Sequence, residues 1–456
     1  MSARPELATS PAADQSGTDS GDKSAPGQAG AQRSQAVWIP AEGSGLRQFW
    51  RVLGPGYLVA VGYMDPGNWA TDLAAGSRYG YRLLWVVAVS SLMAMLLQSL
   101  CCRLGIATGL DLAQACRQLL PKRMRLPLWL LAEAAIVACD LAELLGSAIA
   151  LQLLLGLPLP WGVALTALDT LLLLLLQRWG LRYLEALVIA LVALVGGCFA
   201  VELTLLQPSW PAVLQGFVPQ LSSLRDGGQL YLAAGILGAT VMPHNLYLHS
   251  SLVKTRQWAP QPGARQLALR YSILDTLVAL GLAFLVNAAI LVLAGGSFHG
   301  REGAAVTELG QAFHLLTPVL GTSVASVLFG VALLASGQSS TLTATLAGQV
   351  VMEGFLNIRL PDWQRRLLTR GLALIPAMVT VIVLGDLGIN HLLVLSQVLL
   401  SLQLPFAAIP LVWFCSQPTL LGDLRTPRWL LALGWLSAAA VVLVNGGLLL
   451  SGGWGG

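Results

Sequence analysis

Charged side chains are scarce in this sequence. Lys, Arg, Asp and Glu make up 11% of the 456 residues, whereas a soluble globular protein carries roughly 25%. Hydrophobic residues make up 55% and gather in long runs of Leu, Ala and Val. The composition excludes a water-soluble protein and predicts an all-α integral membrane protein, because barrels have short alternating strands instead.

Signatures of several other classes are missing too. The sequence has no Gly-Lys pair, so the phosphate-binding loop of a primary pump is absent. No histidine is followed by glutamate, which excludes the HExxH pattern of zinc hydrolases. The cysteines form no CxxC pair and lie in or beside apolar runs, as small core residues do. They are Cys101, Cys102, Cys116, Cys139, Cys198 and Cys415. We therefore expect no enzyme, no cofactor and, at a net charge of +4, no nucleic-acid partner.

Residues 1–45 are rich in Ser, Ala, Gly, Gln and Asp and contain almost no apolar run. We expect a disordered tail and no secretory signal peptide. Eleven apolar segments follow, each suited to a spanning helix of about 20 residues. They lie near residues 52–75, 83–102, 127–155, 161–177, 183–205, 229–253, 270–296, 318–347, 367–385, 390–414 and 428–450.

The distribution of basic residues predicts the orientation, because cytoplasmic loops are rich in Lys and Arg. With the N-terminus inside, 22 of the 26 basic residues fall on the cytoplasmic side. The other four are Arg78, Arg82, Arg225 and Arg301. Eleven spans place the C-terminus outside. Because Arg outnumbers Lys by 23 to 3, the sequence also hints at a GC-rich bacterial genome and a bacterial plasma membrane.

Two of the apolar segments are interrupted. Gly62-Tyr63-Met64-Asp65-Pro66-Gly67-Asn68 breaks the first, and Ala239-Thr240-Val241-Met242-Pro243-His244 breaks the sixth. Broken helices at corresponding positions are typical of transporters with inverted repeats, which bind their substrate between the breaks. We therefore expect a first repeat in 46–210, a second in 225–414, and an eleventh helix with the outer C-terminus in 420–456. The alternative for the first break is a kinked helix whose protonated Asp65 faces a neighbour.

The polar groups at the breaks indicate the substrate. Asp65 offers a hard anionic oxygen, Asn68 a neutral oxygen and Met242 a soft thioether. Oxygen-only sites suit Mg²⁺ and Ca²⁺, whereas a thioether favours softer divalent metals, so we expect Mn²⁺, Fe²⁺ and similar ions. Two alternatives stay open. One is a related transporter that is selective for Mg²⁺, and the other is a LeuT-like symporter of an organic solute. Met242 argues against the first, since Mg²⁺ gains nothing from sulfur, and the acidic first break suits a cation better than the carboxylate of an organic substrate.

Three acids of the third segment, Glu133, Asp140 and Glu143, lie within an arc of about 80° on a helix. Acids on one face of a spanning helix favour a proton relay or a cation route, although partners could also neutralise them for stability. Asp65 is the sole acidic candidate ligand, so a metal ion and a proton should compete for it. The acids would then accept the displaced proton.

The motifs Asp65-Pro66-Gly67-Asn68 and Met242-Pro243-His244 resemble the two signatures of the Nramp (natural resistance-associated macrophage protein) family. The stretch from Gly337 to Gln349 is similar to that family's transport motif, with Ala344 in place of a usual glycine. The resemblance covers residues 46–414. It implies a LeuT-like fold and proton-coupled uptake of divalent transition metals, with ions, protons and lipid as partners and no obligate protein partner.

The resemblance also implies the roles of single residues. The metal ligands would be the side chains of Asp65, Asn68 and Met242 with the backbone carbonyls of Gly62 and Ala239. Gln397 would join them in some conformations. A polar network would lead protons from Asp65 toward the cytoplasm, and its members would be His244, Glu133, Asp140, Glu143 and Arg370. Arg370 could equally be a surface arginine at the inner end of its helix. Asn287 matches a polar family position of the seventh helix, whereas Asp169 and Asp275 receive no role.

Overall fold

The structure, a computed structural model, describes residues 37–39, 53–177, 181–258, 263–300, 306, 308–358, 360–383 and 385–451. They belong to one unit that begins at Val37. Most of the predicted tail lies outside the described residues. Within it, strand β1 (Val37–Ile39) pairs in parallel with strand β2 (Arg256–Trp258), so the predicted disorder does not extend to these three residues.

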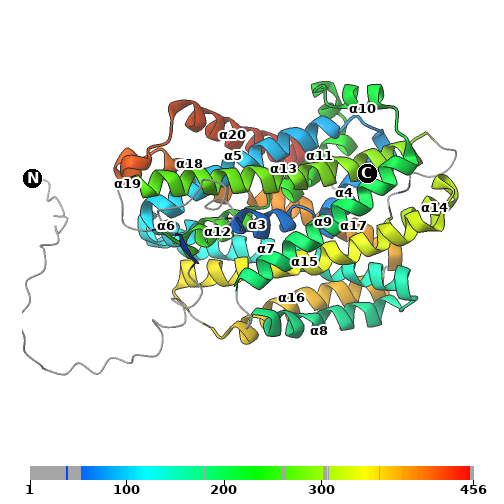
Figure 1. Ribbon diagram of the computed structural model, residues 1–456, viewed down its shortest axis with the longest axis horizontal. Coiled ribbons are helices and arrows are strands. Elements are labelled where there is room, and N and C mark those ends of the chain that lie inside the picture. Colours follow the sequence, from blue (N-terminus) through cyan, green and yellow to red (C-terminus); the bar gives the residue numbers. More distant parts are fainter. Residues whose placement is uncertain are drawn as a thin grey trace, which may run out of the picture. The chain divides into compact units, whose positions relative to one another are not determined.

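The described chain is almost entirely helical (Figure 1). The long helices are α5 (Leu84–Thr108), α7 (Lys122–Leu155), α8 (Leu159–Gln177), α9 (Leu181–Leu206), α13 (Ala264–Phe298), α15 (Ser323–Leu356), α16 (Asp362–Val383), α17 (Gly385–Gln403) and α20 (Arg428–Ser451). The shorter ones are α3 (Pro55–Gly62), α4 (Pro66–Tyr79), α6 (Leu112–Leu119), α10 (Trp210–Gly216), α11 (Gly227–Val241), α12 (Pro243–Leu252), α14 (Leu309–Leu320), α18 (Pro405–Cys415) and α19 (Pro418–Leu421). Three short 3₁₀ turns are η1 (Leu221–Arg225), η2 (Val253–Thr255) and η3 (Gly422–Leu424).

Each of the eleven predicted segments coincides with helix. Within the described residues, seven helices are long and apolar enough to cross a membrane, α17 and α18 together counting as one. The other four predicted spans are α8, α16 and the two broken pairs α3/α4 and α11/α12. Some helices extend beyond the predicted apolar segments. Helix α7 begins at Lys122, before the segment 127–155, and α15 ends at Leu356, after the segment 318–347. The first turn of α7 is mostly exposed and rich in basic residues, whereas the last turns of α15 are buried and pack against α6.

Both predicted breaks are present. Helix α3 ends at Gly62 and α4 begins at Pro66, with Asp65 as its N-cap. Pro66 fits there because the first helical residue needs no N–H donor. Between α11 and α12, Met242 adopts a φ of +32°. A non-glycine residue in that region is strained, and such strain gathers at functional sites.

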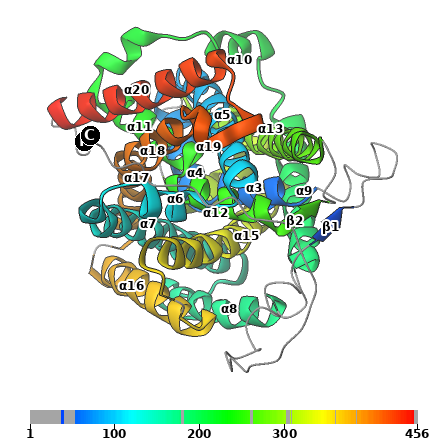
Figure 2. The same cartoon turned by 90° about the vertical axis from the view of Figure 1, so that its left-hand side faces the viewer.

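The broken helices lie in the interior of the bundle. The end-on view of Figure 2 shows α3, α4 and α12 surrounded by α5, α7, α13 and α15. Helix α20 lies on one side of them, and α8 with α16 lies on the other (Figures 1 and 2). The third helix of each predicted half, α7 and α15, has 34 residues, and the two pack against each other beside the first break.

A polar clamp holds the start of α3. The carboxylate of Asp275 accepts hydrogen bonds from the backbone N–H groups of Gly54 (3.3 Å) and Gly56 (2.7 Å). The carbonyl of Leu53 accepts from Arg182 Nη1 (2.9 Å) and Arg256 Nη2 (3.3 Å). Glu185 pairs with both arginines, at 3.2 Å and 2.6 Å. Asp275, which had no role from the sequence, therefore caps the first half-helix.

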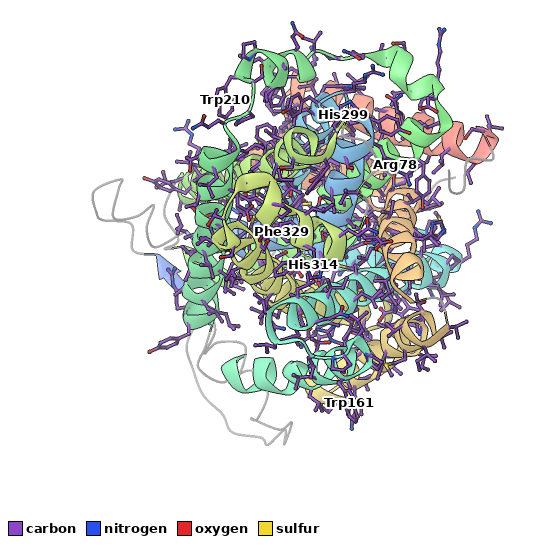
Figure 3. The ribbon with its side chains drawn as sticks, turned by 90° about the vertical axis from the view of Figure 1, so that its right-hand side faces the viewer. Arg78, Trp161, Trp210, His299, His314 and Phe329 are labelled. Carbon is purple, nitrogen blue, oxygen red and sulfur yellow. The ribbon has the colours of Figure 1, made fainter. Side chains whose placement is uncertain are left out.

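Residues from predicted outer loops meet at one end of the bundle. Figure 3 views that end, where Arg78, Trp161, Trp210, His299 and His314 are labelled. Trp161 and Trp210 are 69% and 57% exposed, and exposed tryptophans are typical of membrane–water interfaces. These residues lie at the end of the bundle that the eleven-helix topology predicts to be the outer one.

Substitution of Gly146 by alanine should destabilise the first break. A Cβ at Gly146 in α7 would lie 2.1 Å from Pro66 Cβ, so α7 or the break must move, at a cost of about 1–3 kcal/mol. The matched control is Gly197→Ala in α9, where a Cβ would meet nothing within 4 Å. Thermal unfolding in detergent should show a lower Tm for Gly146→Ala alone. Equal Tm values for the two variants would contradict this packing.

Single cysteines should report opposite sides of the membrane. The six native cysteines are all buried, whereas Arg123 and Trp210 are exposed. We expect Arg123→Cys to react with an impermeant thiol reagent only from the cytoplasmic side and Trp210→Cys only from outside, because the basic loops should face the cytoplasm. Labelling of both from the same side would refute the eleven-helix topology.

Candidate metal site

Asp65 is fully buried at the first break. Its Oδ1 accepts hydrogen bonds from Asn68 N (2.9 Å) and Asn68 Nδ2 (2.7 Å). Its Oδ2 has no hydrogen-bond partner among the described residues. Burial of such an oxygen is unfavourable unless a proton or a cation satisfies it. One oxygen of Asp65 thus caps α4, and the other is available to a ligand.

Asn68 joins the two breaks. Its Nδ2 donates to the carbonyl of Ala239 in α11 (3.0 Å), and its Oδ1 lies 3.4 Å from Asn287 Nδ2 of α13. Asn287 Nδ2 also donates to the carbonyl of Tyr63 (2.8 Å). The structure therefore brings together three of the predicted ligands, Asp65, Asn68 and the Ala239 carbonyl, and adds Asn287 as a residue that orients them.

Gly62 and Gln397 flank the first break. The Gly62 carbonyl accepts from Asp65 N at 3.4 Å. Gln397 of α17 lies against Gly67, because a Cβ there would be 1.8 Å from Gln397 Nε2. The Oε1 of Gln397 is buried and has no hydrogen-bond partner within the described part of the chain. Gly62 and Gln397 thus both lie next to Asp65, and Gln397 offers an oxygen atom that no described residue hydrogen-bonds.

Met242 is fully buried at the second break and accepts a weak hydrogen bond from Asn245 Nδ2 (3.4 Å). The described residues contain no group of three or more His, Cys, Asp or Glu side chains arranged to hold a metal. The donors at the breaks are instead one carboxylate, two amides, a thioether and backbone carbonyls. Such a set lacks the closed thiolate and imidazole shell of a structural metal site.

Two of the third-helix acids face an arginine. Arg370 Nη1 of α16 lies 3.9 Å from Asp140 Oδ1 and 4.0 Å from Glu143 Oε2. Its Nη2 donates to Thr341 Oγ1 of α15 (2.9 Å). Arg370 is 5% exposed, which rules out the alternative of a surface arginine. The predicted association of Arg370 with these acids is present.

Glu133 pairs with a different arginine, which the sequence analysis missed. Its Oε1 lies 2.9 Å from Arg365 Nη2. The sequence shows acids seven residues apart on α7 and arginines five residues apart on α16, but it does not show that the two helices are neighbours. His244 is 1% exposed, and neither ring nitrogen hydrogen-bonds to another described residue. No hydrogen bond therefore links His244 to the predicted network.

A second series of hydrogen-bonded polar side chains begins at Tyr63 in the first break. The sequence analysis missed this series too. Tyr63 OH accepts from Gln98 Nε2 (2.6 Å), and Gln98 Oε1 lies 2.8 Å from His249 Nδ1. His249 Nε2 lies 3.4 Å from Thr276 Oγ1. A glutamine in the apolar run of α5 was the available signal. The side chain of Asp169 lies outside the described residues.

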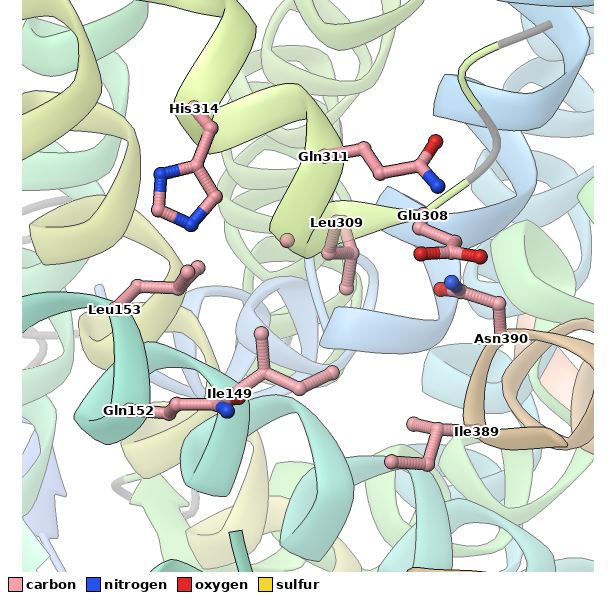
Figure 4. Close-up of a pocket in the computed structure, with 10 residues that line it drawn as sticks. Ile149, Gln152, Leu153, Glu308, Leu309, Gln311, His314, Ile389 and Asn390 are labelled. Carbon is pink, nitrogen blue, oxygen red and sulfur yellow. The ribbon is translucent and has the colours of Figure 1, made fainter. Parts of the chain in front are cut away.

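A cavity of about 250 Å³ lies between α7, α14 and α17. In Figure 4, Glu308 and Asn390 lie side by side on one wall, and His314 lies across the cavity from them. Gln152 and Gln311 add further polar groups. None of the predicted ligands lines this cavity, so the site rests on the buried donors of the two breaks.

Comparison with known proteins gives consistent matches. The family described as "Natural resistance-associated macrophage protein-like" (Nramp) matches residues 56–451. The "Divalent metal cation transporter MntH" of Nostoc sp. is 56% identical over 421 residues, which cover 92% of this chain and 95% of the relative. A crystal structure of the Eremococcus coleocola manganese transporter has a TM-score of 0.83 at 40% identity, covering 90% of this chain and 88% of that one.

A more distant likeness bears on the fold alone. The structure of MhsT in complex with L-phenylalanine has a TM-score of 0.59 at 16% identity and covers 86% of this chain and 98% of that one. MhsT has the LeuT-like fold of two inverted five-helix repeats, so the predicted fold class is confirmed. Since the family match spans most of its length, the chain belongs to the Nramp family.

Proposed function

We propose that this protein is a secondary transporter that imports divalent transition metal ions, Mn²⁺ with Fe²⁺ and similar ions, together with protons. The observation that carries the proposal is the buried Oδ2 of Asp65, which has no partner among the described residues. It lies where Asn68 links the two breaks. The Nostoc relative is named as a divalent metal cation transporter and the Eremococcus protein as a manganese transporter, which supports the same class of cargo. The metal ion is cargo and no resident cofactor is needed.

The proposed ligands are the side chains of Asp65, Asn68 and Met242 with the carbonyls of Gly62 and Ala239. Gln397 would join them in some conformations. Met242 disfavours a magnesium-selective protein, because Mg²⁺ gains little from sulfur. Asp65 disfavours an organic symporter, because its charge would repel a substrate carboxylate.

Protons would follow a separate route along α7. A metal ion that binds Asp65 displaces the proton which a buried, unpaired carboxylate otherwise holds. Asp140 and Glu143 are buried acceptors beside Arg370, and Glu133 with Arg365 lies nearer the predicted inner end. His244 would lie on the same route next to Met242. The arginine balances the charge of these acids, so that a proton can pass between them.

We further propose the plasma (inner) membrane as the location, with the N-terminus cytoplasmic and the C-terminus outside. The proposed domains are a tail in 1–45, inverted repeats in 46–210 and 225–414, and an eleventh helix in 420–456. The distribution of basic residues and the two breaks support this division. No obligate protein partner is needed.

Substitution of Met242 by alanine should weaken the discrimination against Ca²⁺ and Mg²⁺ while Mn²⁺ transport continues. Loss of sulfur penalises the softer metals and leaves the oxygen ligands in place. We expect the inhibition of Mn²⁺ uptake by Ca²⁺ to strengthen by on the order of tenfold, about 1.4 kcal/mol. Competition assays in proteoliposomes measure this. If Ca²⁺ competes no better than with the wild type, Met242 serves only for packing.

Uptake of Mn²⁺ with a lumenal pH dye in proteoliposomes tests the function itself. The wild type should move Mn²⁺ and protons, and Asp65→Ala should lose both. Asp140→Asn should bind Mn²⁺ with nearly normal affinity by calorimetry but lose most of its proton flux. An amide keeps the size of the carboxyl group but cannot accept a proton.

A wild type that takes up no Mn²⁺ would refute the proposed function. If Asp140→Asn instead loses Mn²⁺ binding as Asp65→Ala does, Asp140 supports the metal site itself. The separation of the two routes would then be wrong.

A further inference from the structure

The tenth span contains an interruption of its own. Helix α17 ends at Gln403 and α18 begins at Pro405. In a continuous helix the carbonyl of Ser401 would accept a hydrogen bond from the N–H group of residue 405, but proline has none. Leu404 N lies 3.2 Å from this carbonyl and is shared with the carbonyl of Leu400 (3.0 Å). The sequence analysis treated this span as one continuous apolar segment and missed the interruption.

Asn445 of the eleventh helix supplies the missing donor. Its Nδ2 donates to the Ser401 carbonyl (2.6 Å), and its Oδ1 accepts from Ser401 Oγ (2.8 Å). Helix α20 contributes two buried polar side chains, Asn445 and Ser437. Ser437 Oγ donates to the Leu433 carbonyl within α20 itself (2.9 Å). Asn445 is therefore the buried polar side chain with which α20 holds another helix.

Ser401 lies one helical turn after Gln397, where α17 meets the second break. A Cβ at Gly238 of α11 would lie 2.0 Å from the Gln397 carbonyl oxygen and 2.5 Å from Ser401 N. The backbones of α11 and α17 thus touch directly before Ala239, whose carbonyl is a proposed ligand. A shift of α17 at Ser401 is therefore transmitted to both sides of the site.

Gln397 and Asp65 meet over Gly67. A Cβ at Gly67 would lie 1.8 Å from Gln397 Nε2 and 3.0 Å from Asp65 Oδ2. Gln397 Nε2 donates to Ser396 Oγ of the same helix (3.0 Å), and Gln397 Oε1 has no hydrogen-bond partner among the residues that the structure describes. No hydrogen bond from this amide to another described helix holds it in place. Its position beside Asp65 depends on the position of α17.

We propose that Asn445 is a positioning residue for the metal site. By holding Ser401 at the Pro405 interruption, it fixes the stretch of α17 that carries Gln397 beside Asp65. The eleventh helix, which lies outside the two predicted repeats, thereby sets how well Gln397 reaches a bound ion. The inference rests on the proposed function, because Gln397 contributes to affinity only if Asp65 binds a metal ion. The alternative is an asparagine that merely attaches α20 to the bundle, as polar side chains do between membrane helices.

A double-mutant cycle separates these two roles. Asn445→Leu removes both hydrogen bonds at similar side-chain size, and leucine suits a membrane helix. We expect it to weaken Mn²⁺ binding, measured by calorimetry on the purified full-length protein, by on the order of fivefold. In a Gln397→Ala background the same substitution should change the affinity by less than about twofold, because the side chain that Asn445 positions is gone.

Two further variants control for folding. Ser437→Ala removes the other buried polar group of α20, which bonds only to its own helix, and should leave Mn²⁺ affinity unchanged. Ser401→Ala removes the bond to Asn445 Oδ1 and keeps the bond to the carbonyl, so it should cause a smaller loss with the same dependence on Gln397. Thermal unfolding in detergent measures the stability of each variant separately. If Asn445→Leu does not fold, the comparison is made with Ser401→Ala.

Equal losses of affinity with and without the Gln397 side chain would overturn the proposal, because Asn445 would then act on the fold alone. An unchanged affinity of Asn445→Leu in the wild-type background would overturn it as well. Failure of the proposed function has a different result, namely a wild type that neither binds Mn²⁺ nor takes it up into proteoliposomes. A wild type that binds Mn²⁺ but gives additive losses refutes the role of Asn445 alone.

Discussion

The structure depends on how two interrupted helices satisfy their backbone inside a membrane. A break leaves N–H and C=O groups without partners, and in hydrocarbon each one costs several kcal/mol. Asp65 and Asn68 meet this demand, because Asp65 Oδ1 caps α4 and Asn68 Nδ2 binds the Ala239 carbonyl of the other break. The same two side chains are the proposed ligands. Metal binding and helix capping therefore share side chains, so a change at the metal should affect both half-helices directly.

The sequence was sufficient to predict the spanning segments and the two breaks, because hydropathy indicates the segments and proline chemistry indicates the breaks. Eleven apolar runs predicted eleven helices, and Pro66 and Pro243 marked where two of them stop. Helix ends were predicted less well, since α7 and α15 continue beyond their apolar runs. Hydropathy detects the apolar run and does not detect the helical residues that continue past it.

Side-chain pairings were harder to predict because they depend on which helices become neighbours. The acids of α7 were recognised from their spacing, but the pairing of Glu133 with Arg365 needs α16 beside α7. The chain from Tyr63 through Gln98 to His249 joins three segments. A single glutamine in an apolar run gives no hint of its partners. Ser401 and Asn445 lie 44 residues apart, and only the fold brings them into contact.

Under the proposed function, the clamp on the first half-helix limits leakage. An opening at the predicted cytoplasmic end that moved α3 would break the bonds of Asp275 to Gly54 and Gly56 and those of two arginines to the Leu53 carbonyl. At about 1 kcal/mol each, these four bonds lower the population of such an opening by a factor of about a thousand. Arg256 also belongs to strand β2, which pairs with Val37–Ile39. Strand β1 is thereby attached to the clamp that, in the proposed transporter, would keep an idle protein from dissipating the proton gradient.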